Sequence, residues 1–196
     1  MAVQKKSSKV SIPKVNEHLK NIIPYPPGKP IEEVQREFGL DSVIKLASNE
    51  NPLGPSPKAI KAMQAVAGEM NLYPDGAGFY LKDALAKRLG VSTGELSLSN
   101  GTDELLVLLA QAYLGPGKEL VTSNYSFVRY SMAAQQVGAP VKLVPMKKMT
   151  HDLTAMAKAI GSKTAMVCLD LPGNPTGCAV TRRQLVKFLK QVPQRV

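Results

Sequence analysis

Regular alternation of strand-like and helix-like segments after Gly90 is the feature that most constrains the fold of this chain. Short apolar runs alternate with longer segments whose apolar residues recur every three or four positions. Such alternation predicts an α/β fold, with a mostly parallel sheet and flanking helices, because parallel strands need crossover connections. The strands that we expect are 96–99, 119–122, 141–145 and 164–169, and the helices are 103–113, 127–137, 152–160 and one that begins at Thr181.

The first forty residues have a different character and predict an extended N-terminal arm. Segment 22–30 contains four prolines, and each proline removes a backbone donor and restricts the residue before it. A short helix is expected at 31–38 and a brief strand at 43–47. Two amphipathic helices should follow, one beginning after Ser56 and one ending at Gly90.

The formal net charge of +10 raises the question of a nucleic-acid or membrane partner. The distribution of charge argues against both partners. Residues 1–141 contain 15 basic and 13 acidic side chains, whereas residues 142–196 contain 10 basic and 2 acidic ones. The basic side chains of this last segment are scattered over several predicted elements, without the interleaved aromatics of a base-stacking surface. We therefore expect neither nucleic acid nor a membrane as partner.

Metal-binding and targeting signals are weak in this sequence. Cys168 and Cys178 match no metal-ligand spacing, and His18 and His151 have no ligand-spaced neighbours. The longest apolar run, 105–114, is too short to span a bilayer. No apolar stretch follows the basic start of the chain, as it would in a signal peptide. We expect a cytoplasmic protein without a metal site.

Three loops that follow predicted strands contain the residues best suited to ligand binding. In Asn100-Gly101-Thr102-Asp103, a glycine and free amides at a helix start could hold a phosphate. Phe127 and Tyr130 share one helical face, where an aromatic ring can stack on a flat heterocycle. Asn-Pro-Thr-Gly at 174–177 should hold the Asn174 amide at a strand tip. Taken singly, these loops are also consistent with a helix cap, core aromatics and a tight turn.

The order of these loops resembles that of the fold-type I aminotransferases, which depend on pyridoxal 5'-phosphate (PLP). Within them the chain is most similar to the histidinol-phosphate aminotransferases. The resemblance extends from about Tyr25 to the end of the chain and rests on five segments: 49–57, 73–75, 100–104, 126–130 and 174–177. One departure is Leu171-Pro172-Gly173, where the family often has a second asparagine and a proline.

The resemblance implies cofactor-binding roles for five residues. Gly101, Thr102 and Asp103 match the loop that holds the cofactor phosphate through backbone amides. Phe127 matches the aromatic residue that stacks on the pyridine ring. Asn174 matches the asparagine that forms a hydrogen bond with the ring oxygen.

Four further residues have implied roles toward the substrate or a second subunit. Tyr73 matches a tyrosine that reaches the cofactor phosphate of the neighbouring subunit, which implies a homodimer. Tyr25 matches a tyrosine supplied to the substrate across that dimer. Asn49 and Glu50 fall in the loop beside the substrate pocket.

The implied activity is amino transfer between histidinol phosphate and 2-oxoglutarate in histidine biosynthesis. The family's cofactor-binding lysine follows the last predicted helix, so we expect it beyond Val196, with no catalytic residue in this chain and no activity of the chain alone. Residues 1–40 would then be an arm with part of a small domain, and 41–196 a partial PLP-binding large domain. Two alternatives remain open: a PLP-dependent threonine-phosphate decarboxylase, and a non-catalytic binding module with the same sheet.

Overall fold

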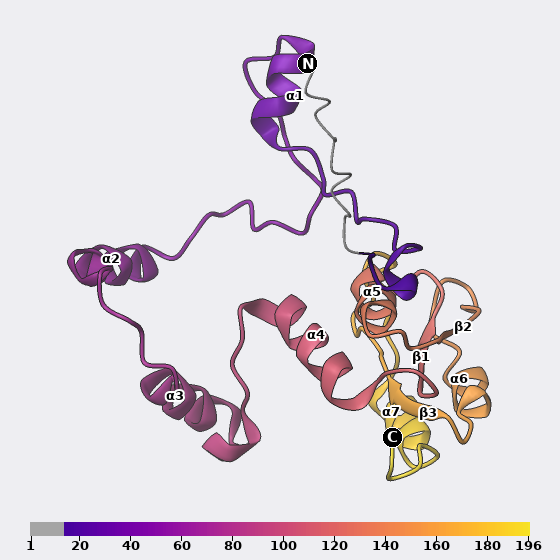
Figure 1. Ribbon diagram of the computed structural model, residues 1–196. Helices are drawn as coiled ribbons and strands as arrows, with labels where there is room; N and C mark the ends of the chain where they lie inside the picture. Colours follow the sequence, from indigo (N-terminus) through magenta and orange to yellow (C-terminus); the bar gives the residue numbers. More distant parts are fainter. Residues whose placement is uncertain (1–13) are drawn as a thin grey trace, which may run out of the picture. The chain divides into compact units, whose positions relative to one another are not determined.

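The computed structural model describes residues 14–196, which form two compact units. One unit contains the described residues up to Ile23 together with 99–196, and the other contains 24–98. The first unit holds the sheet and its helices (Figure 1). Residues 1–13, where the predicted arm begins, lie outside the described part. The limits of these units differ from the domain boundary predicted at residue 40. That boundary concerns a complete large domain and stays a prediction.

Three parallel strands form the sheet, in the order β2-β1-β3. Leu120 of the central strand lies opposite Val141 on one side and Met166 on the other. The strands are β1 (Glu119–Ser123), β2 (Val141–Val144) and β3 (Thr164–Val167). The structure therefore confirms the predicted parallel sheet.

Helices occupy the connections between the strands, as the alternation predicts. The helices of this unit are α4 (Gly101–Tyr113), α5 (Val128–Gln136), α6 (Leu153–Ala159) and α7 (Arg182–Leu189), preceded by a 3-10 turn, η1 (Glu17–Leu19). Asp152 caps α6, since its carboxylate accepts a hydrogen bond from the Ala155 N–H. A capping box begins α7 at Thr181, as expected.

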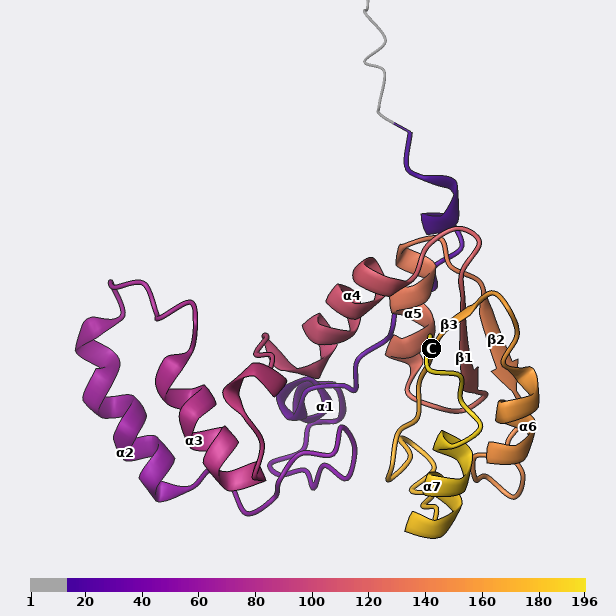
Figure 2. The ribbon, with the colours of Figure 1, turned by 90° about the horizontal axis from the view of Figure 1, so that it is seen from below.

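Successive residues of β1 pack on opposite faces of the sheet, because side chains alternate along a strand. Leu120 belongs to a core cluster with residues of α4 and α5, and Val121 to a second cluster with residues of α6 and α7. Helices α4 and α5 therefore cover one face, and α6 and α7 cover the other (Figure 2). Burial on both faces is typical of a parallel sheet.

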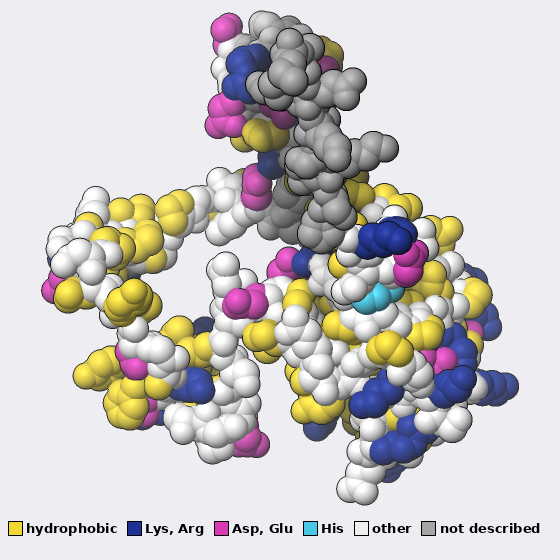
Figure 3. Space-filling view, in the orientation of Figure 1, with side chains coloured by type: hydrophobic (Ala, Val, Ile, Leu, Met, Phe, Trp, Pro, Cys, Tyr) yellow, Lys and Arg dark blue, Asp and Glu magenta, His cyan; other side chains and the backbone are white. Residues whose placement is uncertain are grey.

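The unit 24–98 contains helices but hardly any core of its own. Its helices are α1 (Ile31–Phe38), α2 (Pro57–Val66) and α3 (Phe79–Leu89), with 3-10 turns η2 (Ala67–Glu69) and η3 (Thr93–Glu95). Gly90 ends α3 in the left-handed conformation, as predicted. Within this unit only Ala86 is buried. Apolar side chains gather on the surface over α2 and α3 (Figure 3), and the exposed ones include Met63, Phe79, Tyr80 and Leu81.

The predicted strands at 43–47 and 96–99 are wrong: neither segment has regular secondary structure. A strand needs a neighbour that pairs with its backbone N–H and C=O groups. Within residues 14–196, the sheet contains β1, β2 and β3 and pairs with neither segment. Apolar composition alone therefore does not produce a strand here.

Among the described residues, no helix combines the length and the apolar character that a membrane crossing requires.

Replacing Thr181 with alanine tests the capping box of α7. Thr181 Oγ accepts the Gln184 N–H at 3.2 Å, and Gln184 Oε1 accepts the Thr181 N–H at 2.8 Å. Thr181→Ala should lower the free energy of unfolding by about 1 kcal/mol in urea denaturation, because a helix-start donor loses its acceptor. Ser56→Ala is the matched control, since Ser56 precedes α2 without a side-chain cap hydrogen bond. Equal losses in the two variants would contradict the assignment.

Candidate functional site

The candidate site lies at the carboxyl edge of the sheet, where loops that follow parallel strands meet. Segment 124–127 follows β1, and segment 168–178 follows β3. The start of α4 reaches the same neighbourhood, because Asp103 near its first residue forms an ion pair with Arg129 of α5. The structure therefore brings three of the sequence-predicted loops to one end of this unit.

The first turn of α4 offers free backbone donors. Gly101 has φ +72°, a left-handed conformation that favours glycine, and its N–H donates to the Ser99 carbonyl at 2.8 Å. Asn100, at the N-cap, makes no side-chain cap hydrogen bond. Within the described residues the N–H groups of Thr102 and Asp103 have no acceptor. Unpaired amides at the positive end of a helix dipole can bind an anion.

The carboxylate of Asp103 would by itself disfavour an anion at this helix start. Arg129 counters that charge, because its Nε–H donates to Asp103 Oδ1. The Arg129 side chain is 19% exposed and that of Asp103 is 56% exposed. This role of Arg129 is not predicted from the sequence, because a contact across 26 positions leaves no local pattern. Because Arg129 balances the charge of Asp103, the backbone N–H groups of this turn can still act as donors to an anion.

Phe127 occupies the N-cap position of α5, one residue before the helix. Its ring centroid lies 5.7 Å from that of Tyr130, with an interplanar angle of 87°. The expected proximity of the two aromatics is thereby confirmed. An edge-to-face contact of this kind fixes the orientation of both rings. Phe127 is half-buried, so part of its surface remains available to a ligand.

Asn174 lies in the loop that follows β3, with its backbone held and its side chain free. The Asn174 N–H donates to Asp170 Oδ2. The loop is closed by two backbone hydrogen bonds, from Gly177 N–H to the Gly173 carbonyl at 2.7 Å and from Gly173 N–H to the Cys178 carbonyl at 2.8 Å. The side-chain amide of Asn174, by contrast, has no hydrogen-bond partner in residues 14–196. That amide is therefore available as a donor at the carboxyl edge.

Asp170 links the Asn174 loop to the aromatic pair. Burial, with a smaller contribution from the charge of Asp170, raises the pKa of Tyr130 to about 12. The same two causes, in the same order, raise the pKa of Cys168 to about 11. Tyr130 and Cys168 therefore stay neutral at neutral pH, and the Asp170 carboxylate lies within electrostatic range of both.

The contact between His151 and Asp170 is not predicted from the sequence. The Nε2 atom of His151 lies 3.1 Å from the main-chain oxygen of Asp170 and 3.3 Å from its Oδ1. A weak signal existed: both residues follow predicted parallel strands, so their loops had to meet at one edge.

Four sequence-predicted residues belong to the unit 24–98. Tyr25 is exposed and Tyr73 is 99% exposed. Asn49 adopts a left-handed conformation with φ 53°, and Glu50 forms an ion pair of 2.7 Å with Lys45. Their roles toward cofactor and substrate stay predictions.

Comparisons with known proteins give a family for this arrangement. Residues 41–195 match the family model described as Aminotransferase class I and II. The histidinol-phosphate aminotransferase of Moorella thermoacetica is 52% identical over 186 residues, which cover 95% of this chain and 48% of that protein. The one from Desulfotalea psychrophila is 43% identical over 188 residues, or 96% of this chain and 49% of that protein. The chain spans about half the length of these curated relatives.

A solved structure shares the fold. The histidinol-phosphate aminotransferase from Sinorhizobium meliloti, in complex with pyridoxal-5'-phosphate, matches with a TM-score of 0.83 at 24% identity. The match covers 95% of this chain and 50% of that one. At this identity the likeness concerns the fold, and it confirms the expected α/β architecture.

Proposed function

Because the chain belongs to the aminotransferase class I and II family, we propose that it supplies the phosphate and ring contacts of a PLP-dependent histidinol-phosphate aminotransferase. One observation supports the substrate above all others: curated relatives of that name are 52% and 43% identical over nearly the whole of this chain. The complete protein would transfer an amino group between histidinol phosphate and 2-oxoglutarate. We expect it to act in the cytoplasm.

The chemistry of the residues at the carboxyl edge supports PLP as the ligand. The free N–H groups of Thr102 and Asp103 would hold the phosphate, and Gly101 leaves space there, since an added Cβ would meet nothing within 4 Å. Phe127 would restrict the plane of the ring by stacking. Asn174 would donate its side-chain N–H to the ring oxygen. When bound, PLP supplies an electron sink that stabilises negative charge next to the transferred nitrogen.

Preorganisation explains why these groups are useful to such a cofactor. The Asn174 backbone is fixed by Asp170 and by the loop hydrogen bonds, so its amide needs little reorganisation to meet a ligand. The Arg129–Asp103 pair ties α5 to the start of α4 and so holds Phe127 near the phosphate donors. Fixed positions for phosphate, ring plane and ring oxygen together set the orientation of the reacting end.

A homodimer completes the proposal. Large apolar side chains such as Met63, Phe79 and Tyr80 are exposed on α2 and α3, which supports burial against further protein (Figure 3). In that dimer Tyr73 would reach the phosphate of the neighbouring subunit's cofactor, and Tyr25 would approach the substrate. Asn49 and Glu50 would lie beside the substrate pocket.

Product analysis of the complete gene product tests this proposal. With PLP, histidinol phosphate and 2-oxoglutarate, we expect stoichiometric glutamate, because the amino group moves from one substrate to the other. Threonine phosphate serves as the alternative substrate. Release of carbon dioxide from it, without glutamate from histidinol phosphate, would favour the decarboxylase. Absence of both turnover and PLP binding would favour a non-catalytic module.

A pair of glycine variants tests the phosphate site. Gly101 and Gly90 have φ +72° and +69°, and a Cβ added to either would meet nothing within 4 Å. Alanine at either position should cost similar backbone strain, about 1 kcal/mol. Only Gly101→Ala should weaken PLP binding, by about tenfold or more, because it moves the phosphate donors. The dissociation constant comes from fluorescence titration of the apo form. The phosphate assignment fails if the two variants bind PLP equally well.

A further inference from the structure

A buried polar cluster joins the carboxyl ends of β1 and β3. Its members are Ser123, His151 and Asp170, whose side chains come from three different parts of the sequence. The His151 side chain is fully buried, that of Asp170 is 9% exposed, and Ser123 as a whole is 1% exposed. His151 Nδ1 lies 2.9 Å from Ser123 Oγ, and Nε2 faces Asp170. Buried polar groups of this kind need partners for every donor and acceptor.

The partners of the imidazole determine where its proton lies. Nε2 faces two acceptors of Asp170, the main-chain oxygen at 3.1 Å and Oδ1 at 3.3 Å. It must therefore carry a hydrogen. Ser123 Oγ also lies 3.3 Å from Met156 Sδ, so its hydroxyl can donate either to Nδ1 or to the sulfur. The ring thus always presents an N–H to Asp170, whether it is neutral or protonated.

Asp170 depends on this N–H more than on any other group near its Oδ1. Its Oδ2 accepts the Asn174 N–H, whereas Oδ1 is buried and has no well-aligned hydrogen bond among the described residues. His151 Nε2 lies 3.3 Å from this oxygen, and its N–H presents positive charge to it. A buried carboxylate without such compensation is unstable and tends to move or to take up a proton.

From this geometry we infer that His151 is a positioning residue, which holds Asp170 and through it the backbone of Asn174. This inference rests on the proposed function, because the Asn174 amide matters as a donor to the PLP ring. The Asp170 carboxylate accepts the Asn174 N–H at Oδ2 and faces His151 Nε2 at Oδ1, so the imidazole fixes the direction of this carboxylate. Loss of the imidazole should loosen the Asn174 loop before it affects the rest of the sheet.

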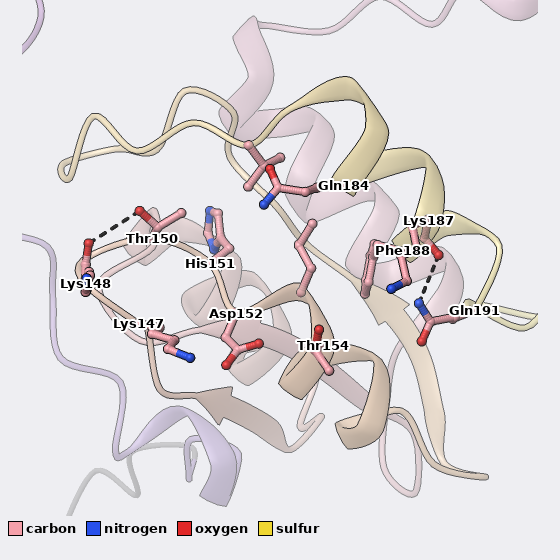
Figure 4. Close-up of a pocket in the computed structure, with 12 residues that line it drawn as sticks. Lys147, Lys148, Thr150, His151, Asp152, Thr154, Gln184, Lys187, Phe188 and Gln191 are labelled. Atoms are coloured by element: carbon pink, nitrogen blue, oxygen red, sulfur yellow. Dashed lines mark hydrogen bonds between the residues drawn. The ribbon is translucent and has the colours of Figure 1, made fainter.

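Two other roles for the cluster do not fit its geometry. Ser, His and Asp are the residue types of a hydrolase triad, but Ser123 is buried and no substrate carbonyl can reach its hydroxyl. His151 lines a cavity of about 750 Å³ between segment 147–154 and α7 (Figure 4). The two ring nitrogens of His151 already face Ser123 and Asp170. The side chain of the neighbouring Asp152 points away from the His151 ring (Figure 4). A ligand in that cavity would find no free imidazole nitrogen.

Three variants of the complete protein test the role of His151. His151→Leu removes both ring nitrogens, whereas His151→Gln keeps an N–H donor that can reach Asp170. Thr154→Val is the matched control, because Thr154 lines the same cavity and, among the described residues, forms no hydrogen bond with Asp170. In the apo form, His151→Leu should raise amide hydrogen exchange across residues 170–178 at least about fivefold. His151→Gln and Thr154→Val should leave that exchange near the parent value.

PLP affinity then separates positioning from a merely structural role. His151→Leu should raise the dissociation constant for PLP about tenfold, and most of that effect should vanish when Asn174 is already alanine. An undiminished effect in the Asn174→Ala background would overturn the inference, as would unchanged exchange and affinity in His151→Leu. If that variant does not fold, Ser123→Ala tests the same link at smaller amplitude. Failure of the parent protein to bind PLP would instead contradict the proposed function, while the exchange result would still be interpretable.

Discussion

Parallel pairing on both sides of β1 is the constraint on which the rest of the structure depends. It buries both faces of the strand, which requires helices on each side, and it directs the ends of neighbouring strands to one edge. Residues from 101 to 177 therefore contribute to one region although they are far apart in sequence. The candidate site is a consequence of this topology, and local sequence only decides which side chains the edge presents.

Compensated carboxylates are the second recurring feature of this edge. Asp103 is paired with Arg129, and Asp170 lies between Asn174 and His151. The Arg129–Asp103 pair neutralises charge that would otherwise repel a phosphorylated ligand, and the Asp170 carboxylate is turned toward the Asn174 N–H and His151 Nε2. The groups that remain available to a ligand are uncharged N–H donors of segments 102–103 and 174 and the ring of Phe127. Such an environment favours binding of an anion without moving charged side chains into its place.

Much of the fold and part of the site could be predicted from the sequence, for identifiable reasons. Helix starts and ends follow local rules, so Thr181 and Gly90 were assigned correctly. Strands depend on partners, so the apolar segments 43–47 and 96–99 were misassigned. The pairing of His151 with Asp170 spans 19 positions and that of Arg129 with Asp103 spans 26, and neither periodicity nor motif spacing reports such contacts.

We propose that the turns at 100–103, 127–130 and 174–177 surround one phosphorylated aromatic ring. A crystal structure of the complete protein with PLP bound tests it most directly. We expect phosphate oxygens within hydrogen-bond distance of the Thr102 and Asp103 N–H groups, the ring against Phe127, and the ring oxygen at the Asn174 amide. A cofactor bound at another place, with these three groups facing solvent, would contradict it.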